Sequence, residues 1–226
     1  VNSRELRFGN KVIQSVFSKI KPRYLVLPYT RCMLLSLIFC PRPDSILHIG
    51  LGGGSIARWL HYEFSSVKQS IIEKNEDVVE AAYRFFEFPS DSRLQIFNAD
   101  ASKLLPKMSE KYDLIFLDAF NDFGAPKEVK QIDFLRSLYC RLKSSGLAVG
   151  NFWTLTGDFK EQCESWGSIF STVYNLDANK KGNEILFGFK NYKIEEEIRY
   201  ENISKILEKR HQIEFQKMKM RLIKLY

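Results

Sequence analysis

The residues with the clearest chemical potential form a glycine-rich segment directly after an apolar run. The segment reads Ile46-Leu-His-Ile-Gly-Leu-Gly-Gly-Gly-Ser55 and is typical of a buried strand that leads straight into a helix. Glycines adopt positive φ without penalty and let the backbone approach a ligand closely. The following helix offers free amides and the positive end of its dipole. The pattern therefore predicts either a tight structural junction or a ligand-binding turn formed by Gly50, Gly52, Gly53 and Gly54.

Glu73 ends the next predicted strand, about twenty residues after the glycine segment. A carboxylate at this place in a nucleotide-binding sheet accepts hydrogen bonds from ribose hydroxyls. The alternative is a solvated or helix-capping Glu. A dinucleotide motif would also require glycine where Ser55 stands, so the spacing favours another nucleoside over NAD.

Asp100, in the run Asn98-Ala-Asp-Ala101, follows the third predicted strand. In a nucleoside-binding sheet this carboxylate can accept a hydrogen bond from the exocyclic amine of adenine. Asp is equally a favoured N-cap for the helix that follows. The sequence leaves both roles open.

Asp118 ends a fourth, entirely apolar strand, and a loop with Asp122, Gly124 and Pro126 follows it. An acid in this position can take a proton from an incoming amine or hold a cationic group. Helix capping is the structural alternative. We favour the chemical role because ligand-type residues end the neighbouring strands as well.

These residues must be positioned by alternating strands and helices, a pattern that predicts parallel βαβ units. The predicted strands are residues 45–49, 68–73, 94–98, 112–117 and 147–152, with 170–174 and 184–190 as a closing antiparallel pair. The predicted helices are residues 55–63, 76–86, 101–108, 132–142 and 159–166. A doubly wound sheet binds its ligands at the carboxyl ends of its strands, where all four groups of residues fall.

The two ends of the chain differ from this pattern. Residues 1–40 predict a short hairpin around Gly9-Asn10 and a helix over 29–39, and residues 41–191 form the predicted nucleoside-binding catalytic domain. In residues 192–226, apolar residues at near-helical spacing predict one long amphipathic helix, packed on the domain or on a second subunit.

Composition limits the class of protein. The apolar fraction is 45%, with 18 Phe and 10 Tyr, which is typical of a globular domain. The longest apolar stretch, residues 33–40, is far short of the roughly twenty residues that span a bilayer. No signal segment is recognisable, so we expect a cytoplasmic protein.

The net charge of +7 comes from scattered Lys and Arg, which disfavours nucleic acid as a partner. The cysteines form no metal-ligand pattern.

Taken together, the motifs resemble the polyamine aminopropyltransferase (spermidine synthase) family, and the chain resembles a diverged member with a shortened N-terminal domain. Leu51-Gly-Gly-Gly-Ser resembles the nucleoside loop of that family. Glu73-Lys-Asn-Glu-Asp-Val-Val-Glu-Ala resembles its ribose-binding segment. Asp118 through Pro126 resembles its catalytic loop. Gln14 and Tyr29 fall where the family places its substrate-contacting Gln and Tyr.

The resemblance implies a Rossmann-like sheet of the S-adenosylmethionine-dependent methyltransferase type, with about seven strands. It implies a homodimer and a role in polyamine biosynthesis. The implied reaction moves an aminopropyl group from decarboxylated S-adenosylmethionine to an amine such as putrescine, without a metal. Asp118, Tyr29 and Asp122 would be catalytic. The nucleoside would be bound by Gln14, Gly50, Gly52, Gly53, Gly54, Glu73, Asp100, Ala101 and Asp118.

Three departures from the family pattern involve acids. Gly53 stands where the family has an Asp that holds the donor's amino group, Asn121 replaces a second acid beside Asp122, and Arg31 replaces a Glu. Fewer acids hold a polyamine cation less well, and the loss at Gly53 relaxes the selection against a carboxylate on the nucleoside. The alternatives are therefore a methyl or aminocarboxypropyl transferase that uses S-adenosylmethionine, and a nucleoside-binding scaffold without turnover.

Two further aromatic residues, His48 and Trp153, lie near these motifs. His48, inside the first predicted strand, is interpreted as a hydrogen-bonded core residue and not as a base. Trp153 follows a strand end and is the tryptophan that could line an acceptor pocket.

Overall fold

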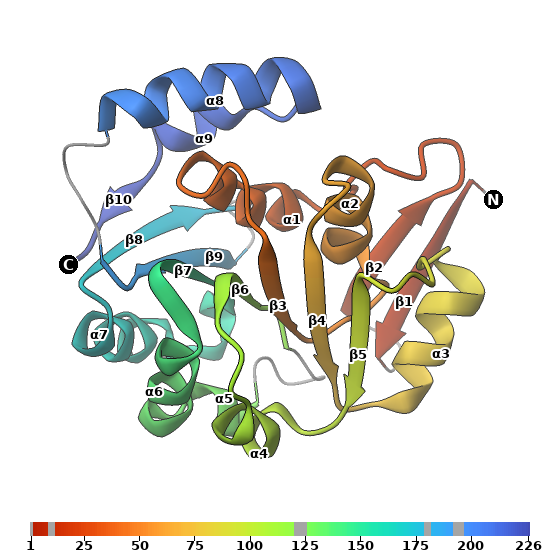
Figure 1. Ribbon diagram of the computed structural model, residues 1–226, viewed down its shortest axis with the longest axis horizontal. Coiled ribbons are helices and arrows are strands. Elements are labelled where there is room, and N and C mark those ends of the chain that lie inside the picture. The colour runs from red at the N-terminus through yellow and green to blue at the C-terminus, as the bar shows by residue number, and fades with distance from the viewer. Residues whose placement is uncertain (1, 9–11, 120–125, 179–181, 192–196) are drawn as a thin grey trace.

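The structure is a computed structural model that describes residues 2–8, 12–119, 126–178, 182–191 and 197–226. Its centre is an eight-stranded sheet with the order β10-β8-β9-β7-β6-β3-β4-β5 (Figure 1). The strands β7, β6, β3, β4 and β5 run parallel, whereas β9, β8 and β10 are added antiparallel. Their bounds are β3 Ser45–Ile49, β4 Lys68–Glu73, β5 Leu94–Asn98, β6 Tyr112–Leu117, β7 Leu142–Trp153, β8 Thr172–Asp177, β9 Asn183–Phe189 and β10 Ile223–Lys224.

Helices cover both faces of this sheet (Figure 1). Successive residues of β3 show why both faces must be covered: Ile46 packs into one apolar core and Leu47 into the other. The first face carries α1 Pro28–Met33, η1 Leu34–Ile38, α2 Ser55–Glu63, α8 Glu197–His211 and α9 Phe215–Lys219. The second face carries α4 Ala101–Leu104, η2 Leu105–Lys107, α5 Lys127–Lys130, α6 Ile132–Cys140 and α7 Phe159–Ile169.

The remaining elements lie at one side of the sheet. The hairpin of β1 Ser3–Phe8 and β2 Val12–Ser18 lies beside α3 Glu76–Phe85 (Figure 1). Phe17 of β2 is fully buried and its ring meets that of Phe86 edge to face, with 6.4 Å between the centroids. This contact holds the hairpin over the carboxyl end of the sheet.

The fold class and the first four predicted strands are confirmed, and these strands have the predicted bounds. The helix predicted for residues 29–39 divides into α1 and the 3₁₀ turn η1. β7 begins earlier than predicted, because residues from 142 also pair with β6 across a shift in register. In the described part of the chain, every helix is too short or too polar to cross a bilayer.

The prediction of one long C-terminal helix is wrong. α8 ends at His211, Gln212 adopts a left-handed φ of 56°, and β10 pairs antiparallel with β8. Leu207, Ile213 and Phe215 all enter the same core. At 3.6 residues per turn, a straight helix would point Ile213 away from the other two. The break buries all three, and the tail therefore packs on its own domain.

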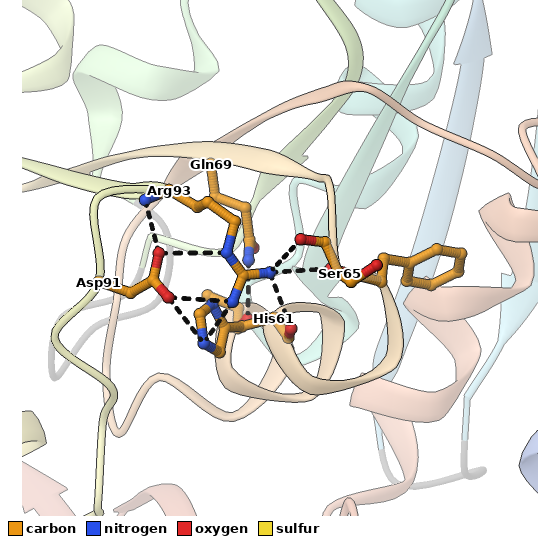
Figure 2. Close-up of polar contacts among 7 residues, drawn as sticks. His61, Ser65, Gln69, Asp91 and Arg93 are labelled. Carbon is orange, nitrogen blue, oxygen red and sulfur yellow. Dashed lines mark hydrogen bonds and ion pairs between the residues drawn. The ribbon is translucent and has the colours of Figure 1, made fainter.

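Arg93 fixes the far end of α2, the helix that begins at the glycine turn (Figure 2). Its Nη1 donates to the carbonyls of His61, Phe64 and Ser65 at 3.3, 3.1 and 2.9 Å. Its Nε and Nη2 each donate to a carboxylate oxygen of Asp91 at 3.1 Å. Orphan carbonyls at a helix end need such donors, so Arg93 anchors α2 to the start of β5.

Replacing Arg93 with Ala should lower the free energy of unfolding by about 2–3 kcal/mol, because several partly buried acceptors lose their donor together. Urea denaturation followed by circular dichroism measures this. Arg84→Ala is the matched control: that side chain is 64% exposed, and its contacts with Glu80 and the Phe85 ring lie at the surface, so its loss should change little. Equal effects for the two variants would contradict the anchoring role.

Candidate active site

A cavity of about 980 Å³ opens at the carboxyl ends of β3, β4, β5 and β6. The residues that line it come from these strand ends and the starts of the helices after them, from α5, and from the hairpin and α1. Most of the residues that the sequence singled out line this cavity: Gln14, Tyr29, Gly50, Gly52, Glu73, Asp100, Ala101 and Asp118. Gly53 and Gly54, also expected to bind the nucleoside, are not part of the wall.

Gly50 allows the ends of β3 and β6 to meet. Its φ is 94°, and a Cβ there would collide with the backbone carbonyl of Asp118. The Asp118 amide donates to the carbonyl of Ile49 at 2.9 Å, and the Gly50 amide donates to that of Ile72 at 2.9 Å. The turn is thus tied to both neighbouring strands, so its position relative to the acids is fixed.

Gly53 is closed off from the cavity. Its amide donates to the Ser15 hydroxyl at 2.8 Å. A Cβ at this position would lie 2.7 Å from the Phe86 ring and 2.9 Å from the Ser15 Cβ. Under Gly54 the ring of Phe88 fills the space in the same way. The hairpin and the segment after α3 therefore leave no room for an acidic side chain at residue 53.

Glu73 is held in place by backbone amides on both sides of its carboxylate. Oε2 accepts from the Leu51 amide and Oε1 from the Asn75 amide, both at 2.9 Å. Each oxygen keeps a further lone pair for a ligand hydroxyl. The acid at the end of β4 is therefore joined directly to the glycine turn and lines the cavity beside it.

Asp100 performs the capping role that the sequence left open. Its Oδ1 accepts from the amide and the hydroxyl of Ser102 at 2.9 and 2.7 Å, and Oδ2 pairs with Lys74 at 2.9 Å. The Ser102 and Lys74 hydrogen bonds lower the pKa of Asp100 to about 2. The carboxylate lines the cavity, but an adenine amine would have to share Oδ2 with Lys74.

Asp118 is held by neutral donors. Its Oδ2 accepts from the Tyr29 hydroxyl at 3.1 Å, and its Oδ1 accepts from Nδ2 of Asn151 at 2.9 Å. Asn151 Oδ1 accepts from the Asn183 amide at 3.1 Å, which fixes the orientation of Asn151. Burial raises the pKa of Asp118 although both hydrogen bonds oppose this. Burial and the nearby Asp118 charge raise the pKa of Tyr29 well above its usual value, so Tyr29 stays protonated and donates.

Asn151 is a site residue that the sequence analysis missed. It is 3% exposed and lies near the end of β7, inside the otherwise apolar run of residues 146–153. A lone amide in such a strand was a usable signal, because buried polar groups require a partner. Trp153, two residues further on, is not among the residues that line the cavity.

Arg31, which stands where the family has a Glu, is not among the residues that line the cavity. Its guanidinium donates to the carbonyl of Leu25 and lies 5.4 Å from the Tyr24 ring centroid. Asn121 and Asp122 of the expected catalytic loop lie outside the described residues. Within the described residues, no cluster of His, Cys, Asp and Glu could hold a metal ion.

His48 is a hydrogen-bonded core residue, as interpreted from the sequence, and it also belongs to the cavity wall. Nε2 lies 2.8 Å from Oε1 of Gln69, whose amide nitrogen donates to the Ala57 carbonyl at 3.1 Å. The fixed amide makes Nε2 the protonated nitrogen of a neutral ring. Burial lowers the pKa of His48 to about 4.

Comparison with known proteins gives a family for this chain. Residues 11–176 match the model of the spermine/spermidine synthase domain. The polyamine aminopropyltransferase of Neisseria meningitidis serogroup A is 30% identical over 200 residues, which cover 87% of this chain and 76% of the relative.

Solved structures show the same fold. A probable spermidine synthase from Corynebacterium glutamicum superposes with a TM-score of 0.75 at 20% identity, covering 88% of this chain and 77% of the other. Human methyltransferase-like protein 13, in complex with SAH, superposes with a TM-score of 0.70 at 21% identity, covering 78% and 90%. The sheet is therefore shared by proteins named for two different transfers.

Acid should destabilise the protein through His48. A histidine whose folded pKa lies below its unfolded value stabilises the fold fully above about pH 6.5, and this contribution is lost as the pH falls toward 4. We expect the protonation of His48 alone to lower the free energy of unfolding by ~3 kcal/mol at pH 4. Urea unfolding across this range should give a shallower fall for His48→Gln, which cannot be protonated; parallel curves for the two proteins would contradict this assignment.

Proposed function

Because the chain belongs to the spermine/spermidine synthase domain family, we propose that it is a transferase that moves an aminopropyl group from decarboxylated S-adenosylmethionine to an amine such as putrescine. One observation carries the proposal. The buried carboxylate of Asp118, oriented by Tyr29 and Asn151, shares a cavity with Glu73 at the glycine turn.

Glu73 supports binding of the nucleoside. Its two oxygens are fixed by backbone amides and keep lone pairs that can accept from the ribose hydroxyls. Asp100 and Ala101 lie at the adenine end, where the backbone at the start of α4 can contact the ring. The sulfonium tail then runs from the ribose past the glycine turn toward Asp118.

Asp118 would prepare the attacking amine. The raised pKa favours uptake of a proton from the acceptor's ammonium group, which must become a free amine before it can attack. The amine nitrogen forms a bond to the tail carbon beside sulfur, and the carbon–sulfur bond breaks with its electron pair moving to sulfur. Methylthioadenosine leaves, and no covalent enzyme intermediate is needed. Catalysis then rests on alignment of the two substrates.

A second candidate is methyl or aminocarboxypropyl transfer from S-adenosylmethionine. The closed position at Gly53 favours it, because no acid can stand there to hold the donor's amino group or to repel a carboxylate. The products separate the candidates. Methyl transfer leaves S-adenosylhomocysteine, whereas aminopropyl and aminocarboxypropyl transfer both release methylthioadenosine and differ in the mass of the group added to the amine. Mass spectrometry after incubation with putrescine and each nucleoside gives this answer directly.

The third candidate is a nucleoside-binding scaffold without turnover. A ligand at one hundred times its dissociation constant stabilises the folded state by about 2.7 kcal/mol, so a thermal-shift screen detects binding independently of catalysis. A clear shift together with no product would favour the scaffold. The homodimer and the cytoplasmic location remain predictions.

Asp118→Asn should lower turnover by a factor of about 10²–10⁴, because the amide cannot take the proton. The variant is nearly isosteric and keeps a partner for Tyr29, so the affinity for the nucleoside should change little. Product formation and nucleoside titration are measured side by side. Unchanged turnover would remove Asp118 from the mechanism.

Glu73→Ala should weaken nucleoside binding itself, by roughly tenfold or more, since hydrogen bonds to a charged group contribute about 1.5–3 kcal/mol. Calorimetric titration with methylthioadenosine measures this. Glu110→Ala provides the control, because that Glu is exposed and outside the cavity. Full affinity in Glu73→Ala would rule out the ribose role.

A further inference from the structure

Two polar side chains of β2 face the cavity with hydrogen-bond donors that have no acceptor among the described residues. Ser15 is 6% exposed, and its oxygen already accepts from the Gly53 amide, so its own proton is left to donate. The side-chain nitrogen of Gln14 is fully enclosed and has no partner in the described structure. Both residues line the cavity. Buried donors without acceptors are costly, which indicates that a ligand satisfies them.

The charge of the cavity wall is divided between its two sides. The acids Glu73, Asp100 and Asp118 line the cavity at or just after the strand ends, and Glu76, Glu128 and the cation Lys74 line the same side. The hairpin side contributes Ser15 and Gln14, together with Arg7, whose guanidinium also binds Glu5 at 2.6 and 2.9 Å. Glu5 itself does not line the cavity. The lining acids therefore all lie on the side of the sheet, whereas the hairpin presents donors and a cation.

Residue 53 has no room for a side chain, because Phe86 and Ser15 block it. No acid at this residue therefore opposes the hairpin donors across the turn. In the proposed function the sulfonium tail runs through the cavity from Glu73 to Asp118, along the wall that Ser15 and Gln14 help to line. A polar group on this tail would therefore lie near the donors of Ser15 and Gln14.

We infer that the hairpin wall is a subsite for a carboxylate on the sulfonium donor, so that this cavity accepts a nucleoside that retains its α-carboxyl group. The inference rests on the proposed function and extends its donor class. With such a donor, the same attack on the carbon beside sulfur transfers an aminocarboxypropyl group, and methylthioadenosine leaves as before. A carboxylate can accept from such donors, whereas an ammonium group could satisfy neither.

Binding of three unreactive nucleosides tests this subsite: methylthioadenosine, S-adenosylhomocysteine and its decarboxylated form. We expect the protein to bind S-adenosylhomocysteine at least as tightly as the decarboxylated compound. Gln14→Glu replaces the donor with an anion and should shift the affinity ratio at least tenfold toward the decarboxylated compound. Ser15→Ala should shift this affinity ratio in the same direction. Methylthioadenosine lacks the amino and carboxyl groups of the tail, so its binding to the Ser15→Ala variant should be unchanged.

Gln95→Glu is the matched control, because it adds the same charge at an exposed residue of β5 outside the cavity and should leave the ratio unchanged. The inference is overturned if the original chain binds the decarboxylated compound at least tenfold more tightly. It is also overturned if Gln14→Glu leaves the ratio unchanged. If none of the three nucleosides binds, the proposed function fails as well, which distinguishes the two failures.

Discussion

The site depends on the close approach of β3 and β6 at Gly50. Without a side chain at this residue, the backbone of the turn lies against the carbonyl of Asp118, and amide–carbonyl bonds join the strand ends. Glu73 adds a third link by accepting from the Leu51 amide. Because these contacts are made by backbone and a fixed carboxylate, the positions of Glu73 and Asp118 relative to each other are set by the sheet itself.

The acids at the edge of the sheet differ in whether a neighbouring cation compensates their charge. Asp100 is paired with Lys74, and its charge is already compensated. In the described structure, Asp118 has only neutral donors, the phenol of Tyr29 and the amide of Asn151. A buried carboxylate that is hydrogen-bonded but unpaired retains its attraction for a cation. This difference is the reason for proposing that Asp118, and not Asp100, is the acid that meets an ammonium group.

The hairpin of β1 and β2 is part of the site. The hairpin closes over the glycine turn through the Ser15–Gly53 bond and the Phe17–Phe86 contact. The same closure removes the space for an acid at residue 53 and places donors in the cavity wall. The departure from the family at Gly53 is therefore connected by packing to the hairpin, which also lines one side of the cavity.

The sequence by itself determined the sheet, the glycine turn and the acids at the strand ends, because these follow from local patterns: apolar runs, glycine spacing and residues at fixed offsets from strands. Tertiary structure decided that Asn151 and Ser15 belong to the site and that Arg31 lies outside the cavity wall. It also decided where the C-terminal helix breaks. Each depends on which side chains from distant segments meet, as Asn183 meets Asn151 or Phe86 meets the hairpin. Asp100 is an intermediate case. Its residue type allowed both helix capping and ligand binding, and only its contacts with Ser102 and Lys74 showed that it caps α4.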